Sequence, residues 1–315
     1  MLTGTGRQVL RQLLADPHAD PAELDWADAR SLALRHGVIV RLADAVSVTG
    51  EPLPPRFQAA AAAACTRTQR ALAIVDRLGA NCDAIGVSHA FLYTAERYPD
   101  SGTVTLLVSA PRSRGLDRAI LDALPAASGA ARNLGNRLAG SSHYSTGAGI
   151  QVRIHHGRLG RLGEHARYAR LLVERAHRVP VGSTSCRVPS PDDHCLLLAI
   201  ARAYADEPPR LDDLAWTIPA LWTQALDWDD LFATALSIGM LESVGAFLAW
   251  TNDVHHQLFG RNVVDAAVLS RFQGRSSHLR RLGAALEAGR WHSAARLSLR
   301  PLIAAVAARR TPRPA

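Results

Sequence analysis

An arginine and a histidine stand two residues apart in the segment 149–156, whose side chains alternate between apolar and polar types. If this segment is a β-strand, alternate side chains face opposite sides, so Gln151, Arg153 and His155 share one face. Arginine clamps the oxygens of a carboxylate, enolate or phosphate in a fork geometry and keeps its proton. Histidine gives or takes a proton near neutral pH. Arg153 and His155 are therefore candidate catalytic residues for metal-free proton transfer on a small carbonyl compound.

Hydroxyl groups alternate with apolar residues in a second segment, 103–109. Thr103 and Thr105 face away from the apolar residues of such a strand, and they are candidates for binding a substrate. Tyr144, in the serine-rich stretch before the first segment, is a further candidate, and His143 stands beside it. A structural explanation stays open for each residue, because threonine favours strands, loop residues are commonly polar and an exposed arginine often pairs with a surface acid.

Helical patterns surround the two strands. Asp25 is typical of the residue that caps a helix, and Gly37 is typical of the residue that ends one. Other helices are expected at 7–15, 38–46, 56–79, 90–97, 116–124, 191–204, 211–221, 228–237, 241–251, 279–286 and 292–308. We also expect a short strand at 81–85 and one strand within the loop-rich region 127–148, and we expect only helices after residue 164.

This order of elements predicts an α+β fold with a small mixed sheet flanked by helices. We divide the chain into an N-terminal helical region (1–80), an α/β core that carries the sheet (81–160) and a C-terminal helical domain (161–315). The length of 315 residues is ample for such an arrangement.

The composition limits the classes of binding partner and the cellular compartment that we expect for this protein. The formal charge is +8, but every basic residue is arginine and the arginines are scattered among acids, so we expect no nucleic-acid partner. The four cysteines lack the spacing of a zinc site and are expected to be reduced and mostly buried. The pair His255-His256 is expected at the surface. We see no signal-peptide pattern and no apolar run that would span a membrane, so we expect a cytoplasmic protein.

Several motifs recur together in an order that resembles a known family. They are Leu24-Asp25-Trp26, Arg35-His36-Gly37-Val38, Tyr98-Pro99, Pro191-Asp192-Asp193-His194 and Asp227-Trp228-Asp229. In this order the chain resembles a poorly characterised bacterial nucleotidyltransferase family of the polymerase-β-like superfamily, over roughly residues 22–250. The resemblance implies that the small mixed sheet is nucleotidyltransferase-like.

The resemblance also implies a metal site that this sequence has lost. Such enzymes carry three carboxylates on two strands, because nucleotidyl transfer depends on magnesium ions and hard cations bind carboxylate oxygens. The matching positions here are Thr103, Thr105 and Arg153, and an arginine repels a cation. The Leu-Lys-Gly motif of the family reads Ser88-His89-Ala90, which makes His89 a candidate second acid or base and Ser88 a candidate substrate-binding residue.

Three functions of different classes follow. The first is an enzyme on a nucleotidyltransferase scaffold that uses Arg153, His155 and His89 for metal-independent elimination, addition, cyclisation or isomerisation of a small molecule. The second is a non-catalytic protein that binds a ligand or partner, and the third is an atypical nucleotidyltransferase. The substrate-binding candidates are Ser88, Thr103, Thr105, Gln151 and Tyr144. We expect a small-molecule substrate and no metal or other cofactor, and the sequence does not set the oligomeric state.

Overall fold

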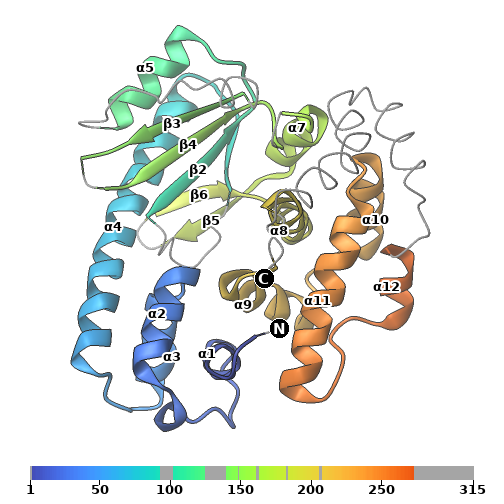
Figure 1. The fold of residues 1–315 in the computed structure, drawn as a ribbon. Coiled ribbons are helices and arrows are strands. Elements are labelled where there is room, and N and C mark those ends of the chain that lie inside the picture. Colours follow the sequence, from blue (N-terminus) through green and yellow to red (C-terminus); the bar gives the residue numbers. More distant parts are fainter. Residues whose placement is uncertain are drawn as a thin grey trace, which may run out of the picture.

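The computed structural model describes residues 2–92, 102–124, 140–147, 149–160, 163–181, 184–205 and 208–272. These residues form a mixed α+β fold in which one face of a small sheet packs on the long helix α4 (Pro55–Ala84) (Figure 1). Further helices precede α4 and follow the sheet in the chain. Among the described residues, no helix is long and apolar enough to cross a membrane.

All three expected N-terminal helices are present, and their ends lie within three residues of the expected ones. They are α1 (Gly4–Leu13), α2 (Trp26–His36) and α3 (Ile39–Val48), with a short 3-10 turn at Pro21–Glu23. The Asp25 carboxylate accepts hydrogen bonds from the main-chain N–H groups of Ala27 and Asp28, at 3.0 and 3.1 Å. Gly37 then ends α2 at φ 66°, in the left-handed region that glycine enters without strain. Both predicted caps of α2 are confirmed.

The four-stranded sheet has the order β1-β2-β4-β3. Its strands are β1 (His89–Leu92), β2 (Thr103–Val108), β3 (Ser141–Ser145) and β4 (Gln151–His156). The central strands β2 and β4 are parallel, and the chain between them includes α5 (Arg114–Ala123) and β3. Both outer strands are antiparallel to their neighbours. The predicted small mixed sheet is confirmed, as are the two central strands and a strand within 127–148.

One face of this sheet is apolar and packs on α4 (Pro55–Ala84) and α5. Val104, Leu106 and Val108 of β2 lie on this face with Val152 and Ile154 of β4, and all five are buried. Figure 1 shows α4 behind the sheet on this side. The alternation in both strands therefore reflects burial of one face against helices.

The helix α4 belongs to two hydrophobic clusters. Its first half places Phe57, Ala61 and Ala64 among α1, α2, α3 and α9 (Leu211–Trp222), and its second half packs under the sheet. With 30 residues it is about 45 Å long. The long alanine-rich helix is thus confirmed, and it runs about five residues beyond its expected end.

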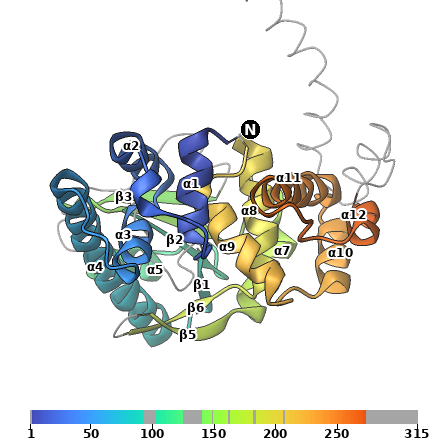
Figure 2. The same cartoon turned by 90° about the horizontal axis from the view of Figure 1, so that it is seen from below.

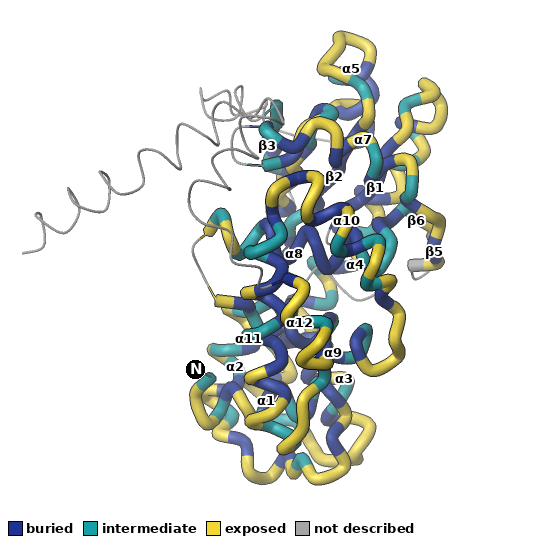
Figure 3. Tube along the Cα trace, turned by 90° about the vertical axis from the view of Figure 1, so that its right-hand side faces the viewer, coloured by how far each residue is buried: buried dark blue, intermediate teal, exposed yellow. Residues whose placement is uncertain are grey.

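The remaining helices form the C-terminal part of the described chain. They are α7 (Ala166–Arg175), α8 (Pro191–Ala205), α10 (Trp228–Ser237), α11 (Leu241–Phe259) and α12 (Ala266–Phe272). Residues 193–200 of α8 are buried (Figure 3), and α9 packs against both α1 and α8 (Figure 2). The helices expected at 279–286 and 292–308 lie outside the described residues, and the three-part division of the chain stays a prediction.

Two predictions of secondary structure around β1 are wrong. Residues 81–84 continue α4, because the helix passes through Gly79 without a break and ends only before Gly86, which turns the chain at φ 66°. Residues 90–92 belong to strand β1 rather than to a helix, and the rest of that expected helix lies outside the described residues. All four residues of β1 are buried, so tertiary packing outweighs their helical spacing.

A hairpin of β5 (His177–Val181) and β6 (Thr184–Val188) lies in the region after residue 164, where the sequence pattern predicts only helices. It packs beside β1 and α4, where Val179, Cys186 and Val188 join the core under the sheet. His255 is buried as well, contrary to the surface position expected for it. Its Nε2 accepts a hydrogen bond from the indole N–H of Trp222 at 3.0 Å.

The close packing of α12 on α11 yields a prediction of stability. A Cβ atom added at Gly245 would lie 2.9 Å from both the Cβ and the carbonyl oxygen of Phe272, which is fully buried. We expect Gly245→Ala to lower the free energy of unfolding by about 1–3 kcal/mol, because the backbone of α12 must move. Chemical denaturation measures this change. The control is Gly115→Ala in α5, where an added Cβ meets nothing within 4 Å; an equal effect of both substitutions would contradict the prediction.

Candidate functional site

The second face of the sheet carries a row of polar side chains on β2, β4 and β3. Arg153 of β4 lies directly opposite Thr105 of β2 on one side and His143 of β3 on the other. Side chains of directly paired residues point to the same face and lie about 5 Å apart at their Cβ atoms. Gln151 is paired in the same way with Thr103 and Ser145, and His155 with Ser141. We call these eight residues the polar face: Thr103, Thr105, Ser141, His143, Ser145, Gln151, Arg153 and His155.

Among the described helices, α7 packs on this side of the sheet, over β1 and β2. There Ala90, Leu92 and Leu107 join its hydrophobic cluster. Arg153 and Gln151 are exposed, His143 and His155 are partly buried, and Thr105 is buried. Within the part of the chain that the structure describes, Arg153 forms no hydrogen bond and no ion pair. A guanidinium group is therefore available at the centre of this face.

The histidines of the polar face are held neutral. Burial, and then the charge of Arg153, lower the pKa of His155 to about 3. The same two causes lower the pKa of His143. With a pKa of about 3, His155 is a poor proton donor and a weak base near neutral pH, so the proton exchange that we expected of it is not favoured. The Nδ1 atom of His155 is buried, and no described residue forms a hydrogen bond with it.

His89 does not lie on the polar face. It is paired with Val108, so its side chain points to the face that packs on α4. There it is almost fully buried, its ring contacts Phe91 edge-on, and its Nδ1 lies 3.2 Å from the carbonyl oxygen of Val87. Burial lowers the pKa of His89 as well. The expected group of Arg153, His155 and His89 is therefore not assembled, and His89 has the surroundings of a structural histidine.

The other substrate-binding candidates are divided between the two faces. Thr103, Thr105 and Gln151 lie on the polar face with Arg153, whereas Tyr144 is paired with Val152 and is buried in the core on α4. Ser88 is exposed just before β1. His143 also lies on the polar face, although it is not among the candidate site residues from the sequence. The sequence feature that indicates this position is the alternation of side chains in the stretch 141–145. If Tyr144 is buried on one face of a strand, His143 faces the opposite side.

The donor set of the polar face does not fit a magnesium ion. Thr103, Thr105 and Arg153, the positions that the resemblance assigns to metal-binding carboxylates, do lie side by side on this face. Their side chains offer two neutral hydroxyls and one cation, and magnesium requires anionic oxygen ligands. Across the described ranges, no group of three His, Cys, Asp or Glu residues could hold a metal ion.

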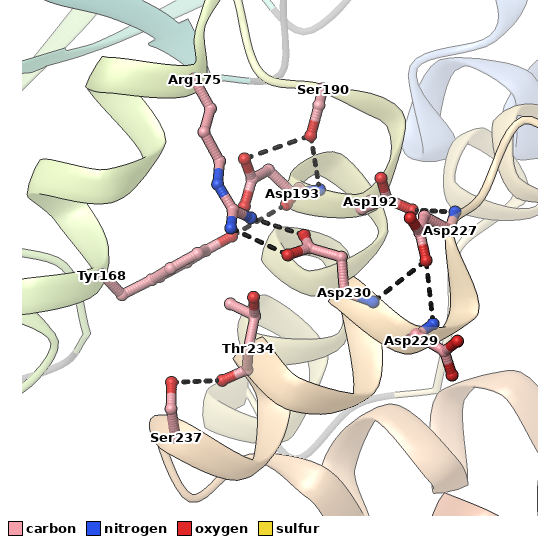
Figure 4. A network of polar contacts seen from close by, with 10 residues as sticks. All are labelled: Tyr168, Arg175, Ser190, Asp192, Asp193, Asp227, Asp229, Asp230, Thr234 and Ser237. Atoms are coloured by element: carbon pink, nitrogen blue, oxygen red, sulfur yellow. Dashed lines mark hydrogen bonds and ion pairs between the residues drawn. The ribbon is translucent and has the colours of Figure 1, made fainter.

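A second polar cluster lies between α7, α8 and α10 (Figure 4). The Arg175 guanidinium donates two hydrogen bonds to the Asp230 carboxylate, at 2.6 and 2.8 Å. Asp193, which is 1 % exposed, accepts a hydrogen bond from the Ser190 hydroxyl, and the Tyr168 hydroxyl donates to its main-chain oxygen. Burial raises the pKa of Asp193, and the charge of Arg175 opposes that rise. These contacts join three helices, and every carboxylate in them already has a partner.

Comparison of the chain with family models, with curated proteins and with solved structures finds no match. The resemblance to the nucleotidyltransferase family therefore rests on the sequence motifs.

Proposed function

We propose that this chain has a nucleotidyltransferase-like fold in which the position of the metal site has become a binding site for a small anion. Arg153 is the anchoring cation of that site. A carboxylate or phosphate group of the ligand accepts hydrogen bonds from its guanidinium group. The hydroxyls of Thr103 and Thr105 and the amide of Gln151 surround it with neutral donors. The ligand is a small molecule, and binding requires no metal ion.

The observation that carries this proposal is the surroundings of Arg153. It is exposed on a sheet face, lies between Thr105 and His143, and has no carboxylate partner within the described ranges. An arginine in a structural ion pair would have such a partner. Binding without catalysis is favoured over proton transfer by His155 and His89, because His155 has a pKa of about 3 and His89 points to the other face.

The nucleotidyltransferase-like fold is supported by the proximity of the three positions that match the metal-binding carboxylates of the family. Thr103 and Thr105 are two residues apart on β2, and Arg153 is paired with Thr105 on the neighbouring parallel strand. This is the arrangement that three metal-binding carboxylates on two strands require. The replaced positions therefore have a common place in the fold, which supports a changed site rather than three unrelated substitutions.

A second candidate function is metal-free acid–base catalysis with His143 in place of His155. It is favoured by the position of His143, which is paired with Arg153 and is only partly buried. A bound carbonyl acid would then be held by Arg153 while His143 moves a proton. Exchange of the methyl protons of pyruvate in deuterated water with EDTA, followed by NMR, tests this candidate. Loss of the exchange in His143→Gln supports it, and no exchange in the unmodified protein excludes it for pyruvate.

The proposal is tested by the binding of phosphate, sulfate and acetate, measured by calorimetry and thermal shift. We expect Arg153→Gln to weaken binding about 10- to 100-fold, because a hydrogen bond to a charged group contributes about 1.5–3 kcal/mol. The control is Arg118→Gln, an exposed arginine of α5 on the opposite side of the sheet, which should bind like the unmodified protein.

Two outcomes would contradict the proposal. The first is equal binding by both variants, because Arg153 would then not be the anchor. The second is tight binding of ATP that requires magnesium, because this would restore the atypical nucleotidyltransferase as the better hypothesis.

A further inference from the structure

We infer that anion binding at the polar face is coupled to the uptake of one proton by His143, so that the site binds anions more tightly as the pH falls. This inference rests on the proposed function and adds a second cationic group to it. It makes His143 the residue that lets the site respond to pH and favours ligand groups with more than one negative charge.

The geometry brings two potential cations to one side of the sheet. His143 and Arg153 are directly paired across β3 and β4, so an anion bound by the guanidinium of Arg153 also lies within reach of the His143 imidazole. The Nε2 atom of His143 lies 3.4 Å from the hydroxyl oxygen of Ser141, a long contact that an anion can replace. His143 is only partly buried, so solvent and a ligand both reach it.

Without an anion, burial and the charge of Arg153 lower the pKa of His143, and the imidazole is neutral at pH 7. A bound anion cancels the repulsion from Arg153 and adds an attraction of its own, so it raises this pKa. Because linkage is reciprocal, the protonated protein binds the anion more tightly than the neutral protein does. The affinity therefore rises as the pH falls through the pKa of His143 in the complex, and it is constant well above that pKa.

The other groups that face His143 do not titrate in this range. Among the described residues, the charged and titratable groups on this side are Arg153 and His155, both on β4. Arg153 stays charged at every pH of interest, and His155 has a pKa of about 3. From β2 the nearest side chain is the neutral Thr105, and His156 points to the opposite face, where its Nε2 contacts the Ser142 hydroxyl.

The test uses sulfate, which carries the same charge throughout pH 5.5–8. Calorimetric titrations at several pH values, each in two buffers with different enthalpies of ionisation, give the affinity and the number of protons taken up. As the pH falls, we expect the affinity of the unmodified protein to rise by up to tenfold per pH unit. This limit applies where His143 is neutral in the free protein and protonated in the complex, and there the uptake on binding approaches one proton. We expect His143→Gln to bind sulfate with an affinity that does not depend on pH.

The control is His256→Gln, an exposed histidine of α11, which should keep the pH dependence of the unmodified protein. Sulfate binding that is independent of pH would overturn this inference and leave the proposed function intact. The same holds if His143→Gln keeps the pH dependence. No sulfate binding at any pH would overturn both the inference and the proposed function.

Discussion

Replacement of Arg175 by methionine is expected to lower the free energy of unfolding by about 3 kcal/mol at pH 7. The substitution removes two charge-assisted hydrogen bonds to Asp230, and it leaves the carboxylate of Asp193 buried without a nearby cation. Removing one partner from a buried ionic network costs about 3–5 kcal/mol, and we take the lower end because Arg175 and Asp230 are each about one third exposed. Chemical denaturation at pH 7 measures the change.

A matched control uses the neighbouring acid of α10, Asp229, whose arginine partner comes from α12. Arg271 forms an ion pair with Asp229 of α10, whose side chain is 88 % exposed, so Arg271→Met should cost less than about 1 kcal/mol. Arg271 also lies over the ring of Phe232, and that contact is included in this limit. If Arg175→Met costs no more than Arg271→Met, the network of Figure 4 does not hold α7 to α10 in the way proposed.

The cost of Arg175→Met should also depend on pH. Burial raises the pKa of Asp193, and loss of the arginine removes a charge that opposes this rise. A carboxyl group whose pKa is raised in the folded state binds a proton more readily folded than unfolded, so it destabilises the protein as the pH increases. The difference between Arg175→Met and the unmodified protein should therefore be smaller at pH 5 than at pH 7. Adding Asp193→Asn to Arg175→Met should recover part of the loss at pH 7.

Introducing three carboxylates at the polar face is expected to create a magnesium site. In the variant Thr103→Asp/Thr105→Asp/Arg153→Asp, the new carboxylates lie on neighbouring strands and point to one face. Without metal they repel one another, so the variant should be less stable than the unmodified protein. Magnesium relieves this repulsion and binds only the folded state. At a concentration 100 times the dissociation constant it adds about 2.7 kcal/mol to the free energy of unfolding, which thermal unfolding with and without magnesium detects.

The control for this variant carries asparagine at the same three positions. It has nearly the same shape without the negative charges, and it should fold and show no stabilisation by magnesium. Circular dichroism establishes that both variants are folded. If the folded aspartate variant is unaffected by magnesium, the three positions do not form a metal site and the nucleotidyltransferase-like interpretation loses its main support.

The parts of the fold that were predicted correctly are those that local chemistry determines. Asp25 and Gly37 delimit α2 because their capping geometry depends only on adjacent residues. The alternation in β2 and β4 reports one buried face, and the register then brings Arg153 beside Thr105. The register itself was not predictable, because strand pairing depends on contacts between distant segments.

The errors arose where tertiary packing decides the outcome. The residues of β1 are buried on both faces, between α4 on one side and the cluster around α7 on the other, so they show no alternation and resemble a helix segment. The face to which His89 points follows from its pairing with Val108, which no local pattern reveals. The low pKa of His155 has the same origin, because it depends on burial and on Arg153. The sequence therefore predicted which residues of β2 and β4 share the polar face, but not the acid–base properties of its histidines.

The helix α4 couples the stability of the two hydrophobic clusters at opposite ends of the molecule. Phe57 near its start is packed among the N-terminal helices, and Leu78 near its end lies under the sheet, so one continuous run of main-chain hydrogen bonds serves both clusters. Fraying of the first half removes the support on which the second half depends. Hydrogen exchange of the α4 amides should therefore report opening at either end, and a cut in the middle of this helix should release both clusters together.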